Sequence, residues 1–408
     1  MTEVDPIAAF FTTRPACTVD GLLAAIEAQA DAADKTRLLD PELVAALKAS
    51  DVMKLTATRA IGGLGASVLQ IGREFEAIAA NCASTAWTMW NHLAVFHLFA
   101  GTLGPRHEPL LRSIVDNGEW VCFPAGAGSG VRGVIDGDMV RLNGQGSWSS
   151  GGRYADWAGV VFVVCDDEGQ RVDPLDLRFA VVGIGDDDNS DEGVKIDPNW
   201  DGIGLRASVT DDIHYTDVVV PLDRCVAWFG ANRAESLREV PVLAHRYRED
   251  WVGLSDVWLG WMAVGLVRAA LDAATAEFRD RRSIMGKKMV TRPTIQVNLG
   301  HAAALIAAAE ATMTTACSEV DRRIATEDVP TEADYLRQMA LSTSALDQLG
   351  QAMALLLRCQ GGNGLRESRD FNRRWRDFQA MPLHINAHRD RVHHQLGRFT
   401  LGEELEAF

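Results

Sequence analysis

The spacing of apolar residues changes twice along the chain, and this change constrains the fold more than any other feature. Up to Asn117 apolar residues recur every three or four positions, as in Leu22, Ile26 and Ala30, which is the spacing of one helix face. Between Glu119 and Trp228 the pattern favours strands, and after Pro241 the helical spacing returns. The sequence therefore predicts an α+β protein with a β unit inserted between two helical units.

Individual elements follow from the same patterns. Helices are predicted for the ranges 67–80, 83–100, 299–324 and 335–359, and strands for 160–165, 179–184 and 213–221. The range 134–140 reads as a hairpin with Asp136 and Gly137 at its turn. The last two helices are apolar on more than one side, so we expect them to be buried in a bundle and at a subunit interface.

Length, charge and cysteine content exclude several classes of protein. A chain of 408 residues is long enough for two or three packed units. Its net charge of −16 disfavours nucleic acid and anionic membranes as partners. The longest apolar runs look shorter than the roughly 20 residues of a membrane span, and seven scattered cysteines indicate reduced thiols. We expect a soluble, cytoplasmic protein.

Two clusters of polar residues offer weak metal-binding patterns. The range 186–193 is rich in Asp, but its spacing differs from that of a calcium-binding EF-hand, so we interpret it as a solvated turn. His388, His393 and His394 have no companion carboxylates in a ligand pattern. No metal site is predicted.

The range 142–152 carries the most specific pattern in the chain. It ends a predicted strand with Trp148, Ser149 and Ser150, and then turns on Gly151 and Gly152. Small polar groups and glycine backbone at a strand end can approach a flat ligand closely.

This range resembles the flavin-contacting strand of the acyl-CoA dehydrogenase fold, whose usual form is Leu-Asn-Gly-x-Lys-x-Trp-Ile-Thr-Asn-Gly. Ser150 stands where that family's Thr bonds flavin N5. The form Trp-x-Ser-Gly, followed by Asp156 and Trp157, is more similar to the two-component flavin monooxygenases that share this fold. Further segments resemble the family in the same order along the chain: 123–129, 200–208, 282–287, 360–364 and 374–377.

The resemblance implies three domains and an assembly. They are an N-terminal helical domain (1–118), a middle β-barrel or sandwich domain (119–235) and a C-terminal four-helix bundle (236–408). A homotetramer built through the C-terminal helices is expected, because that is the usual assembly of the resembled family.

The resemblance also implies site residues. Flavin would contact Phe123, Trp148, Ser149, Ser150, Gly361 and Gly362, while Arg282 would reach a flavin phosphate, often across the dimer interface. The catalytic group would be Ser150, His384 and His92, although a helix histidine beside Trp90 is more often part of a core. Substrate would contact Trp90, Asn91, Arg206 and Trp251.

Three functions remain open at this point. The first is a flavin-dependent monooxygenase that uses reduced FMN or FAD and O₂, through a C4a-hydroperoxyflavin, to hydroxylate or oxidise an aromatic or amine-bearing small molecule. No dinucleotide-binding glycine pattern opens a βα unit, so a separate NAD(P)H:flavin reductase would supply the reduced flavin.

The alternative is an acyl-CoA dehydrogenase or flavin desaturase, which needs a carboxylate base. In the segment 250–262, which corresponds to the helix that carries this base in some relatives, Asp256 is the only internal carboxylate. The third is a catalytically silent relative that serves in binding or assembly.

Overall fold

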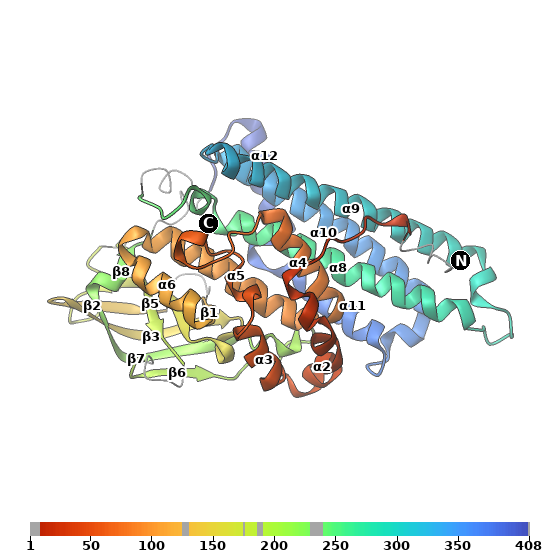
Figure 1. Ribbon diagram of the computed structural model, residues 1–408, viewed down its shortest axis with the longest axis horizontal. Coiled ribbons are helices and arrows are strands. Elements are labelled where there is room, and N and C mark those ends of the chain that lie inside the picture. The colour runs from red at the N-terminus through yellow and green to blue at the C-terminus, as the bar shows by residue number, and fades with distance from the viewer. Residues whose placement is uncertain (1–8, 125–129, 174–175, 186–190, 229–239, 407–408) are drawn as a thin grey trace.

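A computed structural model describes residues 9–124, 130–173, 176–185, 191–228 and 240–406 (Figure 1). The N-terminal part is helical, as predicted, and the helices expected at 67–80 and 83–100 are confirmed. Ser67 caps the first of these, because its side chain accepts a hydrogen bond from the backbone N–H of Gln70. The helices are α2 (Leu23–Thr36), α3 (Pro41–Lys48), α4 (Val68–Asn81), α5 (Ala83–Leu103) and α6 (Glu108–Asn117).

Eight strands follow and are joined in one sheet. They are β1 (Val121–Cys122), β2 (Arg132–Asp136), β3 (Met139–Ser149), β4 (Trp157–Cys165), β5 (Leu177–Gly183), β6 (Val194–Asp197), β7 (Asp211–Pro221) and β8 (Cys225–Ala227). Their order is β6-β7-β3-β2-β4-β5-β8, with β1 added beside β4. The predicted hairpin is confirmed, but its turn residues are Gly137 and Asp138, because Asp136 still pairs with Met139. Gly137 has a positive φ of +60°, which glycine adopts without strain. Hydrogen bonds between neighbours thus connect all the described strands into one sheet.

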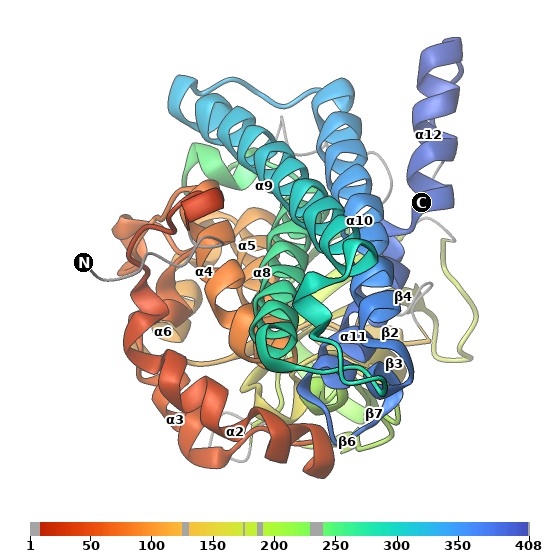
Figure 2. The ribbon, with the colours of Figure 1, turned by 90° about the vertical axis from the view of Figure 1, so that its right-hand side faces the viewer.

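The C-terminal part is helical again and is organised around one long helix. It contains α8 (Trp251–Asp280), α9 (Pro293–Thr326), α10 (Glu332–Gln360), α11 (Asp370–Ala380) and α12 (Arg389–Leu401). Figure 2 shows α8 running between α4 and α5 on one side and α9 and α10 on the other. The fourth helix of the predicted bundle, α11, has 11 residues, against 30 in α8.

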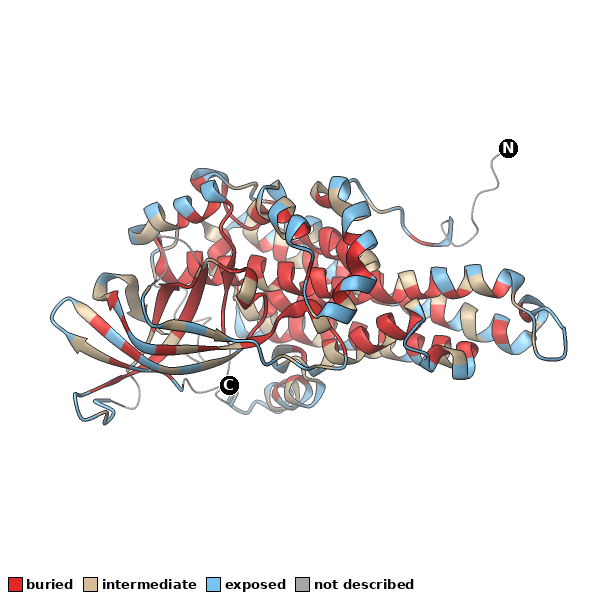
Figure 3. Cartoon of the chain, turned by 90° about the horizontal axis from the view of Figure 1, so that it is seen from below, coloured by how far each residue is buried: buried red, intermediate tan, exposed pale blue. Residues whose placement is uncertain are grey.

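Helix α8 corrects the expectation that no apolar stretch approaches the length of a membrane span. By length and composition alone it is apolar enough to cross a bilayer, but 78% of its most apolar window is buried inside the protein. Such burial is typical of a core helix. Figure 3 shows buried residues concentrated in the middle of the molecule, where the sheet meets the helices.

Two segments named from the sequence lie wholly or partly outside the described residues. They are the flavin-loop segment beyond Pro124 and the Asp-rich turn at 186–190. At the predicted domain boundaries, α6 ends at Asn117, β1 begins at Val121, β8 ends at Ala227 and α8 begins at Trp251.

Candidate active site

The end of β3 places Ser150 in a chain of hydroxyl groups. Ser150 Oγ accepts a hydrogen bond from Trp87 Nε1 at 2.9 Å and lies 2.9 Å from Thr210 Oγ1, which is 2.7 Å from Ser208 Oγ. If the Ser208 hydroxyl donates to Thr210 and the Thr210 hydroxyl donates to Ser150, the Ser150 hydroxyl can donate its own hydrogen to another acceptor. Ser150 is thus built to donate one hydrogen bond at the end of the strand.

The two residues before Ser150 point in different directions. Ser149 is fully buried, and its hydroxyl donates to Cys122 Sγ at 3.1 Å. Trp148 has a φ of +67°, which is uncommon for a bulky residue, and its ring is exposed beside Trp200. Of the predicted pair of serines, Ser149 therefore serves the core, while Ser150 is free to act.

His384 lies against the same aromatic helix face. It follows the short helix η11 (Met381–Leu383), and its ring meets Trp87 at 5.6 Å and Trp90 at 5.0 Å, both edge to face. Burial lowers the pKa of His384 to about 4, and the positive charge of Arg391 adds to this lowering. The imidazole is therefore neutral at neutral pH and can accept a hydrogen bond. We call Ser150, Trp87, Trp90 and His384 the central site.

Four predicted substrate or cofactor residues have different surroundings. Phe123 packs edge to face on Trp251 at 5.8 Å, so this predicted cofactor residue and this predicted substrate residue lie together near the start of α8. Asn91 follows Trp90 on α5, and its buried Oδ1 has no hydrogen-bond partner among the described residues. Arg206 instead lies 3.7 Å from Asp34 of α2. The buried Nε of Arg206 has no hydrogen-bond partner among the described residues, so its role as a substrate contact stays a prediction.

His92 corrects the catalytic group that the resemblance implies. Its Nδ1 accepts from the backbone N–H of Val121 at 3.1 Å, and Nε2 lies 3.1 Å from the carbonyl of Met53. The ring is 1% exposed, and burial lowers its pKa to about 4. Because both ring nitrogens hold backbone groups, we assign His92 a structural role.

Replacing His92 by leucine should therefore reduce stability and leave catalysis intact. The change leaves the Val121 amide and the Met53 carbonyl without partners, at a cost of about 1–3 kcal/mol each. Denaturant unfolding should detect this loss, with turnover per folded molecule unchanged and with exposed His393→Leu as the neutral control. Wild-type stability combined with lost turnover would return His92 to the catalytic group.

The remaining predicted cofactor residues lie at the other end of α8. This helix has 30 residues, about 45 Å, and Arg282 follows its C-terminus. Gly361 lies at the same end, since the neighbouring Arg281 donates to the side chain of Gln360 at 3.2 Å. Arg282, Gly361 and Gly362 are exposed. One flavin cannot touch both ends of α8 within a single chain.

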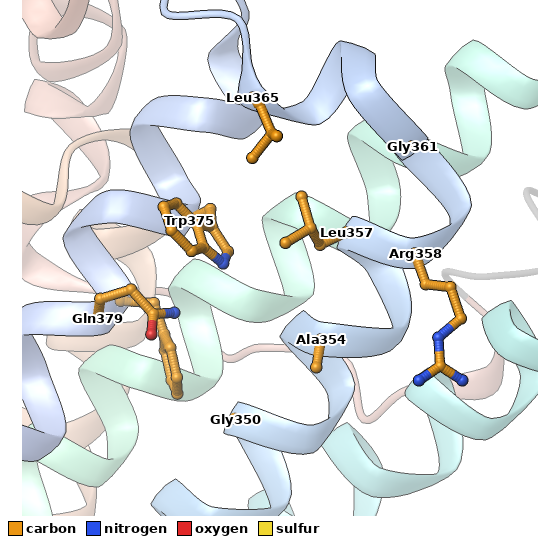
Figure 4. A pocket seen from close by; sticks show the side chains of 9 residues that line it. Gly350, Ala354, Leu357, Arg358, Gly361, Leu365, Trp375 and Gln379 are labelled. Carbon is orange, nitrogen blue, oxygen red and sulfur yellow. The ribbon is translucent and has the colours of Figure 1, made fainter.

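A groove of about 450 Å³ opens beside Gly361 (Figure 4). Its lining comes from α10, α11 and the turn between them, and includes Ala354, Leu357, Arg358, Leu365, Trp375 and Phe378. The lining is mainly aliphatic and aromatic, with Arg358 as its cation.

Comparison with known proteins adds to this geometry. The family "Acyl-CoA dehydrogenase, C-terminal domain" matches residues 257–389. The chain is 26% identical to the pigment production hydroxylase of a Rhodococcus species, covering 94% of this chain and 95% of the relative. It is 25% identical to the flavin-dependent monooxygenase oxygenase subunit HsaA of Rhodococcus jostii, covering 94% and 97%. XiaF from a Streptomyces species, solved with FADH₂ and glycerol, superposes with a TM-score of 0.84 at 20% identity over 96% of each chain.

Proposed function

Because the chain belongs to the acyl-CoA dehydrogenase fold superfamily, on its two-component flavin-dependent monooxygenase branch, we propose that it is the oxygenase component of such a system. It uses reduced flavin and O₂ to hydroxylate or oxidise an aromatic small molecule. Bound reduced flavin would supply the electrons that split O₂, so that one oxygen atom enters the substrate and the other leaves as water.

The observation that carries this proposal is the position of Ser150 and His384 on one tryptophan. Trp87 donates to the Ser150 hydroxyl and also packs against the His384 ring. Ser150 offers a hydrogen bond to a flavin ring, while His384 offers a neutral imidazole to a substrate. A phenol that donates a hydrogen bond to His384 becomes more electron-rich and reacts more readily with an electrophilic oxygen.

The surroundings of the central site fit a flavin reaction that water would spoil. Trp87 and Trp90 are 6% and 3% exposed, and both indole N–H groups are already bonded within the protein, to Ser150 and to the carbonyl of Ser255. The wall therefore presents apolar ring surface, and Ser150 and His384 supply its polar groups. A largely dry wall protects a reactive oxygen species from water.

The dehydrogenase alternative needs a carboxylate base that is ionised. Asp256 is fully buried, and burial raises its pKa well above the usual value for an aspartate. That environment disfavours the charged form, so the arrangement supports oxygenation over α-proton abstraction. Anaerobic titration of the oxidised flavoprotein with an acyl-CoA should leave the flavin absorbance unchanged; bleaching would favour the dehydrogenase.

The separation of the predicted cofactor residues supports a second proposal. We propose that each flavin is held by Ser150 of one protomer and Arg282 of another, within a homotetramer. The exposed Arg282 donates to the carbonyl of Gly286 at 2.9 Å, which holds its guanidinium at the turn after α8. A guanidinium fixed in this way suits a phosphate.

Replacing Arg282 by alanine should weaken flavin binding without changing the central site. The loss of one charge-assisted hydrogen bond, about 1.5–3 kcal/mol, corresponds to a 10- to 150-fold higher Kd for FAD or FMN. Fluorescence titration should detect the change, with Lys35→Ala on the exposed face of α2 as a control that removes the same charge elsewhere. An unchanged Kd would remove Arg282 from the cofactor site.

Co-expression distinguishes a shared site from a site within one chain. Mixed oligomers of Arg282→Ala and Ser150→Ala subunits contain some sites in which both residues are wild type, if two protomers build each site. Activity should then exceed that of either variant alone. Mixed oligomers without such recovery would contradict a site shared between protomers.

A separate NAD(P)H:flavin reductase completes the proposed system. We also propose that the protein acts in the cytoplasm, because all seven cysteines are free thiols, which suits a reducing compartment. The direct test mixes the protein and anaerobically reduced FMN or FAD with oxygenated buffer in a stopped-flow instrument. A long-lived transient, blue-shifted from oxidised flavin, is expected. Oxidation as fast as that of free flavin would contradict the proposed function.

A further inference from the structure

Left-handed backbone conformations at bulky residues are concentrated beside the hydroxyl chain of the central site. Six non-glycine residues in the described part of the chain have a left-handed φ, and three of them lie here: Trp148 at +67°, Leu205 at +49° and Val209 at +44°. Trp148 stands two residues before Ser150, and Val209 directly precedes Thr210. Such strain persists only where the surrounding structure holds it, and it is typical of functional sites. The loop 203–210 must therefore be held by its neighbours.

Helix α11 holds the beginning of this loop through two adjacent residues. The buried carboxylate of Asp377 accepts a hydrogen bond from the backbone N–H of Leu205 at 2.7 Å, and Arg376 Nη1 donates to the carbonyl of Ile203 at 2.6 Å. Burial raises the pKa of Asp377 to about 6, so the carboxylate is ionised at neutral pH and accepts a charge-assisted bond. Gly204 lies so close to α11 that a Cβ atom there would collide with the carbonyl of Arg376. We call these contacts the loop clamp.

A single turn connects the loop clamp to the hydroxyl chain. The backbone N–H of Ser208 donates to the carbonyl of Leu205 at 3.0 Å, and the Ser208 carbonyl accepts from the N–H of Gly151 at 2.8 Å. The next hydroxyl, Thr210 Oγ1, lies 2.9 Å from Ser150 Oγ. Because this short loop spans the distance from α11 to the end of β3, a shift at the clamp moves Thr210 relative to Ser150.

We propose that Asp377 is a positioning residue for the proposed function, because it holds the strained loop where Thr210 orients the Ser150 hydroxyl. The inference rests on the proposed function and adds a residue that acts through the loop rather than on flavin or substrate. Helix α11 also continues through η11 to His384, seven residues after Asp377. The same helix therefore places both polar groups of the central site.

Hydrogen exchange of the Trp87 indole N–H in the flavin-free protein tests this positioning, because that group donates to Ser150. The measurement is NMR of protein labelled with ¹⁵N-tryptophan. Asp377→Ala should speed the exchange about 10- to 150-fold, since it removes a hydrogen bond to a charged acceptor. Asp377→Asn keeps an acceptor oxygen and should stay within a few-fold of the wild-type rate. The Trp90 indole, which donates to the Ser255 carbonyl from the same helix, is the internal reference and should keep its rate.

Two further variants separate the loop clamp from the stability of α11. Gly204→Ala loosens the clamp without changing Asp377, because the added Cβ collides with the Arg376 carbonyl, and should also speed the Trp87 exchange. It keeps the proposal testable if Asp377→Ala does not fold. Asp370→Ala is the matched control, since Asp370 pairs with two arginines of the same helix and does not contact the loop. It should leave the Trp87 exchange at the wild-type rate.

Catalysis supplies a second readout. With reduced flavin and substrate, Asp377→Ala and Gly204→Ala should lower the ratio of oxidised product to hydrogen peroxide about 10- to 100-fold, whereas Asp377→Asn and Asp370→Ala should keep it. An unchanged Trp87 exchange in Asp377→Ala and Gly204→Ala would overturn the proposal, and so would equal acceleration at Trp87 and Trp90 or equal acceleration in Asp370→Ala. A missing oxygen transient in wild-type protein would instead contradict the proposed function, since the exchange measurement needs neither flavin nor substrate.

Discussion

Replacing His384 by alanine is expected to lower substrate oxidation by about 10²- to 10⁴-fold while reduced flavin still binds and O₂ is still consumed. The imidazole is the neutral base of the central site, held edge to face between Trp87 and Trp90. Without it a phenol loses this hydrogen bond and reacts more slowly, so oxygen activated at the flavin is released as hydrogen peroxide. The measurement is the ratio of oxidised product to hydrogen peroxide, with the phenol that the wild-type protein oxidises fastest.

His388→Ala is the matched control, since His388 lies only four residues further on, directly before α12. It should leave the ratio unchanged, and full activity of His384→Ala would remove His384 from the mechanism.

The pH profile adds a second readout. Because the folded pKa is about 4, below the usual 6.5, the imidazole stays neutral as the pH falls through 6.5. Activity should therefore not decrease near pH 6.5 and should fall only as the pH approaches 4. Stability follows a different course, because the His384 side chain of the unfolded protein takes up a proton below pH 6.5 while that of the folded protein does not. The free energy of unfolding should therefore decrease as the pH falls from 6.5 to 4.

The elements were predictable where one period of apolar residues dominated. Helices α4 and α5 and strands β4, β5 and β7 form where the periodicity places them. Of these, only β7 alternates between buried and exposed residues, whereas α5 and β4 are buried on nearly all sides. The span of α8 was less apparent, since Asp256 interrupts an otherwise apolar stretch. Whether such a stretch lies in a bilayer or in a core depends on contacts with α4, α5, α9 and α10, which periodicity does not report.

The site was predictable in its types of residue but only partly in its geometry. Ser150 and His384 come from segments more than 200 residues apart, and no spacing in the sequence brings both to Trp87. Thr210 was missed, although a second hydroxyl two residues after Ser208 was a usable signal. His92 was misassigned because a histidine on an aromatic helix gives no sign of which backbone groups its nitrogens will bond.

Replacing Ser150 by alanine is the second change with a large expected effect. The flavin loses the one hydrogen bond that the end of β3 can donate, so the oxygen-dependent transient should decay about 10- to 100-fold faster and hydrogen peroxide should replace product. Stopped-flow absorbance gives the lifetime. Ser150→Thr keeps the hydroxyl and should keep the lifetime within a few-fold of the wild-type value.

Ser149→Ala separates this chemical role from a structural one. Both serines are buried and adjacent, and each loses a hydroxyl that is hydrogen-bonded within the protein, to Cys122 for Ser149 and to Trp87 and Thr210 for Ser150. Each variant should therefore lose about 1–2 kcal/mol of stability. If the lifetime of the transient shortens equally in both variants, the cause is loosening of the end of β3, and the Ser150 hydroxyl does not act on the flavin. If it shortens only in Ser150→Ala, the hydroxyl acts on the flavin itself, because the two changes then differ only in the direction in which the lost hydrogen bond points.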